Sequence, residues 1–478
     1  MLIRKLALGL SLGALLGGAA LLVACPASLD ARCDDGACGP VTGSNVEAGT
    51  PDTGPIDPCA TDPSQPRCID ETKAYFVSSS GKSDAAGTKG APLSTLSGAL
   101  ALVTATSDKR RIYVCPGTYR ESLDLLPQHS GVSVFGTLGC DFASKATEKP
   151  VLVGGTTALK LPASVNGVAF NDVEIQSSKA TDPGGSSIAA SVLGGATFTN
   201  VTFRAADGAN GSDAGPNDGF DAGLPAAGSD GYEGLSNRGG DGGVRQCPDD
   251  TSRGGTGGPT SGSGLSGSPG ATSNAQSADN CANSGRAAAD AGAAGRAGEN
   301  GTPGNLGELT ATTWTAGSGG RGAPGGLGQG GGGGGGYGSA GGGGGSGGCG
   351  GLGGAGAAGG GASIAFACYQ CSVALVGCEF VTGSGGNGGN AVLGQRGGAG
   401  GNGGIGGCRG GAGGAGGAGG AGGGGAGGVV ADVIAVRDAG AIQVVTPTLR
   451  LGTPGIGGKS PGGTAANGSN GTQIQFRQ

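Results

Sequence analysis

Side chains that perform acid–base chemistry are sparse in this chain, and their spacing does not form a recognisable catalytic set. His129 is the single histidine among 478 residues, in a turn-like segment where we expect it to be exposed. The text G-x-S-x-G occurs in the apolar N-terminal stretch, at Ser11, and inside glycine-rich runs, as at Ser346. None of these places is the strand-to-helix elbow that presents a nucleophile in one large class of hydrolases. Asp172 and Glu174 would share a face of a strand, and Glu379 would align with Glu174 if their strands stack. We therefore predict no catalytic residues and no cofactor.

Aspartates set among glycines raise the question of a calcium site. Carboxylate oxygens are the ligands that calcium prefers, but this spacing fits neither an EF-hand loop nor the G-G-x-G-x-D repeat. Aspartate in such segments also bonds backbone groups without a metal, so we predict no metal site. The residues concerned are Asp207, Asp213, Asp218, Asp221 and Asp230.

The first 25 residues have the features of an export signal. Arg4 and Lys5 precede an apolar stretch, residues 6–20, and Leu-Val-Ala-Cys ends at Cys25. This tetrapeptide resembles the lipobox of bacterial lipoproteins, which implies that Cys25 is acylated and becomes the mature N-terminus. A plain signal peptide is the alternative. The resemblance implies an exported protein held at a membrane of the bacterial envelope by its lipid, and we expect the outer membrane.

Thirteen of the 14 cysteines remain after Cys25 is set aside. Export makes disulfides plausible, and an odd number leaves at least one thiol free or bonded to another molecule. The C-x-x-C pair Cys368 and Cys371 lies among alternating apolar residues, so we expect a structural role. Two further pairs bracket short polar loops and are disulfide candidates: Cys33 with Cys38, and Cys59 with Cys68.

Composition excludes a conventional core over much of the chain. Glycine contributes 119 residues, aromatic residues 4% and charged residues 13%. The formal net charge of -6 argues against a nucleic-acid partner. Glycine is costly to order, so the glycine is either flexible filler or part of a structure that only glycine permits.

Residues 74–160 contain short apolar strands and one segment, 94–104, with helical spacing. The text Tyr75-Phe76-Val77-Ser78, Pro92-Leu93-Ser94-Thr95-Leu96 and Ile112-Tyr113-Val114-Cys115-Pro116-Gly117-Thr118-Tyr119 resembles the opening of the pectin-lyase-like superfamily. The resemblance implies an all-β fold: a right-handed parallel β-helix with a short N-terminal capping helix. It also leaves a polysaccharide lyase or glycosidase as an alternative function. Cys115 and Cys140, in places similar to those of glycine-rich lipoproteins of myxobacteria-like bacteria, are disulfide candidates.

A weak repeat predicts stacked coils. Residues 172–175, 200–203 and 377–380 each have a turn residue followed by apolar-polar-apolar text, and glycine-rich insertions leave from the same place after two of them. The predicted parts are a signal peptide (1–24), a Pro/Asp-rich tether (25–73), the cap and first coils (74–204), an insertion (205–361), a coil (362–382), a second insertion (383–428) and C-terminal coils (429–478).

The insertions have a period of three. Arg396, Ala399, Asn402 and Ile405 are separated by glycine pairs, as are the alanines from Ala412 to Ala421. Three residues per turn is the repeat of the polyproline II helix, and bare glycine faces would let neighbouring helices pair N–H with C=O. The text resembles the polyglycine-II bundles of glycine-rich antifreeze proteins and phage tail-tip adhesins. A flexible linker is the alternative.

Together these features predict a non-enzymatic cell-surface lipoprotein with a structural or adhesive role. Its partners would be the membrane, through the lipid, and a surface glycan or another cell-surface protein. We expect the contacts to come from outward residues of the insertions, namely Arg396, Asn402, Asn387 and Asn390. Ice binding, with the alanine row as the candidate face, is a further alternative.

Overall fold

The computed structural model describes residues 65–215, 226–248, 250–269, 275–311, 313–436 and 440–476. The chain divides into two units, Met1–Ile56 and Asp57–Gln478, and every described residue belongs to the second. The predicted signal peptide and most of the tether, with Cys25, Cys33, Cys38 and Cys59, lie outside the described residues. Across the described part of the chain, no helix has the length and apolar character needed to span a membrane.

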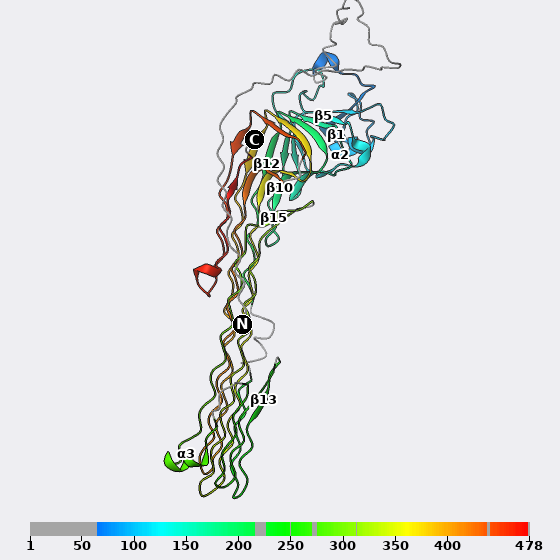
Figure 1. Cartoon of the computed structure of the whole chain (residues 1–478). Helices are drawn as coiled ribbons and strands as arrows, with labels where there is room; N and C mark the ends of the chain where they lie inside the picture. The colour runs from blue at the N-terminus through cyan, green and yellow to red at the C-terminus, as the bar shows by residue number, and fades with distance from the viewer. Residues whose placement is uncertain are drawn as a thin grey trace, which may run out of the picture. The chain divides into compact units, whose positions relative to one another are not determined.

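Three parallel sheets form a β-helix, because from β2 onward successive strands of the coils lie in different sheets and each pairs with the equivalent strand one coil later (Figure 1). The first sheet contains β1 (Ala74–Lys82), β2 (Arg111–Val114), β5 (Ser133–Phe135), β8 (Val168–Asn171), β11 (Gly195–Thr199), β18 (Ser372–Val376) and β21 (Ile442–Val445). The second contains β3 (Thr118–Tyr119), β6 (Val151–Val153), β9 (Glu174–Gln176), β12 (Thr202–Ala205), β19 (Glu379–Thr382) and β22 (Thr448–Arg450). The third contains β4 (Leu123–Asp124), β7 (Thr157–Leu161), β10 (Ser187–Val192), β17 (Ser363–Cys368), β20 (Val430–Ala435) and β23 (Gln473–Ile474).

The core of the coils consists of inward apolar side chains that stack from one coil to the next. Phe170 pairs in register with Phe198, and their rings stack at 5.6 Å. Phe203 and Phe380, on the second sheet, stack at the same distance. Such aromatic pairs contribute about 0.5–1.5 kcal/mol beyond the area they bury. The inward residues of these alternating strands thus stack their rings into a buried column.

The predicted repeat is confirmed by the turn between the first and second sheets. Asp172, Asn200 and Gly377 occupy equivalent positions and have φ values of 53°, 52° and 61°. The strands that follow them, β9, β12 and β19, pair in parallel register. Asparagine, aspartate and glycine adopt this left-handed conformation more readily than other residues, which fits these three copies. Thr446, at the same place between β21 and β22, also adopts it, with φ 49°.

The predicted capping helix is also confirmed, as α2 (Leu96–Ala101). The Thr95 hydroxyl accepts a hydrogen bond from the Gly98 N–H at the start of the helix. Leu96 and Leu100 are buried in the same core as the first strands. Two 3-10 segments belong to this part of the chain, Pro66–Cys68 and Pro127–His129. The all-β parallel β-helix with a short cap is therefore the observed fold.

The insertions form an ordered bundle of tracts, which extend from the coils toward α3 (Ala278–Asn283) in Figure 1. Residues 341–346 lie at its centre, and their backbone N–H groups donate in turn to three neighbouring tracts with a period of three. Their carbonyl groups accept from three other tracts with the same period. The donors' partners lie in 255–258, 408–411 and 229–232, and the other three tracts are 240–243, 331–334 and 401–404. Three residues per turn direct successive polar groups to different neighbours, as the polyproline II prediction requires.

The glycine content of a tract increases with the number of its faces that are packed against neighbouring tracts. Residues 341–345 are all glycine and all buried. The tract 411–420 repeats two glycines and an alanine, and its alanines are exposed. The tract 292–304 has one glycine per triplet, and most of its other residues are exposed. A Cβ added at Gly344 would run into the carbonyl groups of Gly331 and Gly332, so a covered face admits no side chain.

All long insertions leave after a strand of the second sheet and return to the third, and there are three of them in the described residues. The first lies between β12 and β17, and the second between β19 and β20.

The prediction that residues 429–478 are coils is wrong in part, because residues 451–472, between β22 and β23, also form tracts. Gly455 and Gly458 donate to the carbonyls of Gly428 and Gly425, and Thr464–Ala466 is a 3-10 turn. Two antiparallel pairs complete the first insertion: β13 (Val244–Gln246) with β14 (Thr251–Arg253), and β15 (Glu308–Leu309) with β16 (Trp314–Thr315).

Candidate functional site: the exposed face and distal end of the glycine bundle

The carboxylates of the coils are engaged in ties between strands. Glu174 accepts from Arg204 Nε at 2.8 Å, and Glu379 pairs with Arg450 Nε at 3.0 Å. Both align with Thr202, which lies between them in the second sheet. They are therefore two strand spacings apart, about 9–10 Å. Each glutamate neutralises an arginine from the next coil, which is a structural arrangement rather than a paired acid and base.

His129 is buried, so the expectation of an exposed turn histidine is wrong. Its side chain is 4% exposed, and Nδ1 accepts a hydrogen bond from the Leu126 N–H at 3.0 Å. Burial lowers the pKa of the imidazole below its ordinary value, and the positive charge of Arg110 lowers it further. A hydrogen bond from the imidazole to the Leu100 backbone acts in the opposite direction and is outweighed. The residue terminates a turn between coils and faces no described nucleophile.

The aspartates of the first insertion bond backbone N–H groups of the adjoining tract. Asp207, Asp213 and Asp230 accept from the N–H groups of Ser384, Asn390 and Asn402, at 2.8, 2.6 and 2.7 Å. Asp218 and Asp221 lie outside the described residues. Within the ranges that the structure covers, no group of three potential metal-ligating side chains occurs.

Asn387 and Asn390, two of the predicted contact residues, belong to the same system of ties. Their Oδ1 atoms accept from the N–H groups of Ile456 and Lys459, each at 2.9 Å. At these positions the N–H of the third residue of a triplet faces a neighbouring outer tract, and an asparagine or aspartate side chain on that tract supplies the acceptor. We call this system the Asx ladder; its function is to join outer tracts.

Arg396 and Asn402, the other predicted contact residues, lie on an open row of the tract 391–406. The row consists of every third residue of the tract from Leu393 to Ile405, and all of these residues are exposed, with Leu393 at 62% and Ile405 at 53%. The N–H groups of Gly413 and Gly416 donate to the carbonyls of Gly401 and Gly398, so the tract 411–420 adjoins this row. The alanines of that tract, Ala412, Ala415 and Ala418, are exposed. We call the two rows together the exposed face. Successive residues of a row are separated by about 9.3 Å, three rises of ~3.1 Å.

The distal end, where the tracts turn near α3, is held by a disulfide between Cys281 of α3 and Cys408. A second disulfide, between Cys247 after β13 and Cys349, lies further back along the bundle (Figure 1). Neither pairing is predicted by the sequence. The Arg286 guanidinium lies 5.7 Å from the centre of the Tyr337 ring, which is 48% exposed. Tyr232 and Leu235 are 67% and 69% exposed beside the turn at 235–238. Gly228, Gly231 and Gly234 have the three-residue spacing of a tract, but no pattern in the sequence indicates that the turn after them exposes Tyr232 and Leu235.

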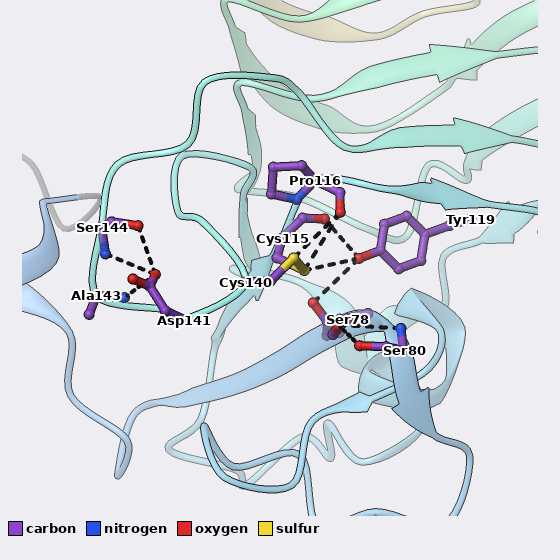
Figure 2. Close-up of a disulfide and its surroundings, with 10 residues drawn as sticks. Ser78, Ser80, Cys115, Pro116, Tyr119, Cys140, Asp141, Ala143 and Ser144 are labelled. Carbon is purple, nitrogen blue, oxygen red and sulfur yellow. Dashed lines mark hydrogen bonds between the residues drawn. A yellow bond between two sulfur atoms is a disulfide. The ribbon is translucent and has the colours of Figure 1, made fainter.

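Cys115 and Cys140 form a disulfide that holds the loop 136–147 against the first coil (Figure 2). The Tyr119 hydroxyl donates to the Cys115 carbonyl at 2.8 Å, and burial raises the pKa of this phenol to about 12. Asp141 caps the loop by accepting from the Ala143 and Ser144 N–H groups (Figure 2). Figure 2 shows these bonds on either side of the disulfide, so they fix the loop rather than a site for chemistry.

The remaining cysteines have structural positions. Cys68 is disulfide-bonded, and Cys368 is bonded to Cys371 at the turn between β17 and β18. Cys378 is the free cysteine of the described residues; burial raises the pKa of its thiol to about 11. A thiol with this pKa and no exposure is not a nucleophile at neutral pH.

Comparison with known proteins gives only distant structural similarity. No protein-family model and no curated protein sequence matches the chain. Solved structures that resemble part of it include a pectin methylesterase from carrot (16% identity, TM-score 0.21, 28% of this chain and 40% of that one). A GH136 lacto-N-biosidase from Eubacterium ramulus (11%, 0.18, 27% and 27%) and a rhamnogalacturonan lyase (13%, 0.18, 34% and 47%) also resemble it. The chain spans less than half of each, and such likeness carries no argument about activity.

Proposed function

We propose that this chain is an exported bacterial lipoprotein, anchored in the outer membrane through acylated Cys25, with a structural or adhesive role at the cell surface. The lipobox-like text Leu22-Val23-Ala24-Cys25 supports the anchor. Engagement of Glu174 and Glu379 in ion pairs favours a non-enzymatic role over the alternative of a lyase or glycosidase.

The observation that supports contact with another surface is the exposed face of the bundle. Leu393 and Ile405 are large apolar side chains left more than half exposed on a backbone in which one glycine N–H group of each triplet, at Gly398, Gly401 and Gly404, is bonded to the central tract. Side chains on such a backbone stand at regular positions before any partner binds, so little ordering entropy is lost on contact. Arg396 and Asn402 add hydrogen-bond donors to the same row. This chemistry suits a surface glycan or another cell-surface protein.

Two measurements on cells test this proposal. Wild-type protein is expected in the membrane fraction with an acylated N-terminal cysteine, and Cys25→Ser is expected to be unacylated and released. Cells that display the wild-type chain are expected to resist detachment by flow better than cells with the triple variant R396A/N402A/I405A. Arg296→Ala, on the tract 292–304, is the control for a lost surface arginine. Membrane retention of unacylated Cys25→Ser contradicts the anchor, and equal detachment contradicts the adhesive role.

A further inference from the structure

A cleft lies beside the exposed face, at the turn where the tract 228–234 reverses into 239–243. Leu235 and Arg238 exchange backbone hydrogen bonds at 2.9 and 3.2 Å and close the turn. Gly231 and Gly234 donate to the carbonyls of Asn402 and Ile405, both at 2.8 Å. The cleft is therefore a continuation of the row that the proposed function uses.

The backbone around the cleft is fixed from behind by the central tract. The Tyr232 N–H donates to the Asp241 carbonyl, and the Tyr232 carbonyl accepts from Gly343, each at 2.9 Å. Gly240 donates to Gly341 at 2.9 Å. Since every one of these bonds uses backbone atoms, the side chain of Tyr232 can be changed without loss of the hydrogen bonds that shape the cleft.

The lining of the cleft combines an aromatic ring, polar groups and glycine. Gly239 and Gly240 are among the lining residues, and the volume is about 410 Å³, within the ~300–1,000 Å³ of small-molecule sites. Tyr232 and Leu235 are each about two-thirds exposed. Arg238 Nη2 contacts both carboxylate oxygens of Asp241, at 3.3 and 3.2 Å.

This combination matches the chemistry of a sugar ring. The flat, exposed face of a tyrosine can cover the C–H groups of a pyranose, while the phenol, carboxylates and guanidinium bond its hydroxyl groups. Arg238 is neutralised by Asp241, which leaves Glu233 as an uncompensated negative charge among the lining residues. That charge disfavours an anionic saccharide.

We propose that Tyr232, Glu233, Leu235, Arg238 and Asp241 form a binding cleft for a neutral saccharide chain. This proposal deepens the adhesive role stated above and rests on it, because it assigns the class of surface molecule that the distal end contacts. The ring of Tyr232 is the stacking platform, and the charged pair of Arg238 and Asp241 orients the hydroxyl groups.

Direct titration tests the cleft. The full-length chain in detergent micelles is titrated with cellohexaose, with the hexamer of N-acetylglucosamine, and with hexagalacturonate as the anionic comparison. Saturable binding of at least one neutral hexamer is expected, and Tyr232→Ala should weaken it about tenfold or more. Tyr232→Phe keeps the ring and should retain most of the affinity. Tyr337→Ala removes the other exposed tyrosine of the distal end and should bind as the wild type does.

Three results would overturn the cleft: no saturable binding of either neutral hexamer up to about 10 mM, equal affinity of Tyr232→Ala and wild type, or tighter binding of hexagalacturonate. The flow assay separates this failure from that of the adhesive role. Cells that still resist detachment with a protein that binds no hexamer would refute the cleft and leave adhesion standing. Loss of both would refute both.

Discussion

Cys281 of α3 is covalently joined to Cys408, 127 residues later in the chain. Cys281 and Cys408 are both fully buried, although the tracts around them have almost no apolar side chains to hold the distal end together. The bond ties a short helix to the turn between the two tracts that carry the exposed face. It therefore supplies at this end what the column of phenylalanine rings supplies in the coils.

Removal of this bond should loosen the distal end alone. In the chain-entropy account, a closed loop of this length contributes roughly 4–5 kcal/mol, an upper value when only part of the fold opens. For the Cys281→Ser/Cys408→Ser double variant we expect faster amide exchange at 228–243 and 404–411, with unchanged exchange in β10 and β17. Cys368→Ser/Cys371→Ser, which opens a link of separation 3, is the control. Uniformly faster exchange across the coils would contradict a local role.

A glycine at the bundle centre should tolerate no side chain. In Gly344→Ala the new Cβ would meet the backbone carbonyls of Gly331 and Gly332. Such overpacking destabilises by about 1–3 kcal/mol or more, so a lower unfolding temperature is expected. Gly90→Ala is the matched control, because its Cβ would meet nothing within 4 Å. Thermal unfolding followed by circular dichroism compares the two, and equal midpoints would show that the centre is not close-packed.

The Asx ladder predicts a different result for two asparagines that look alike in sequence. Asn387→Ala leaves the Ile456 N–H without its acceptor, which should destabilise by about 0.5–1.5 kcal/mol. Asn387→Asp keeps an oxygen at the same place and should restore most of the loss. Asn402→Ala, on the exposed face, should change stability little. Denaturant unfolding measures all three, and an equal loss in Asn387→Ala and Asn402→Ala would refute the distinction.

The single histidine should make the N-terminal coils sensitive to acid. Folding lowers the pKa of His129 through burial, so the unfolded chain binds the proton more readily. Stability is therefore unaffected above the ordinary value of 6.5 and falls as the pH drops below it. His129→Asn should remove that part of the pH dependence. Because the chain has one histidine, its imidazole resonance reports the pKa directly, and a value at or above 6.5 would contradict the assignment.

The coils could be predicted from local sequence patterns. For the bundle, the three-residue period could be predicted, but not which tracts are neighbours. Residues 172–175, 200–203 and 377–380 could be matched because a left-handed turn followed by alternating residues is a local requirement. Tract neighbours are not local: Gly343 bonds Tyr232 and Gly240 bonds Gly341, and nothing in a G-G-X repeat distinguishes one neighbour from another. The disulfides Cys247–Cys349 and Cys281–Cys408 could not be predicted for the same reason, because each joins tracts whose proximity the sequence does not indicate.

Other differences come from signals that were present but weak. Gly452, Gly455 and Gly458 have the three-residue spacing of a tract, but the run is too short to be distinguished from a coil by its sequence alone. His129 lies in a polar turn, and the backbone partners of its buried imidazole, Leu126 and Leu100, cannot be identified from the sequence. Asn387 and Asn402 have the same sequence context, so their different roles depend on whether another tract covers the row.

The direction of the bundle's hydrogen bonds has a mechanical consequence. Bonds such as Gly343 to Tyr232 and Gly404 to Gly343 join neighbouring tracts side by side. A pull along the tracts, applied between the distal end and the coils over roughly 60 Å of about 20 residues at ~3.1 Å each, loads many of these bonds in shear at once. Sideways peeling would break them one after another. The bundle should therefore resist tension along its length far better than force across it.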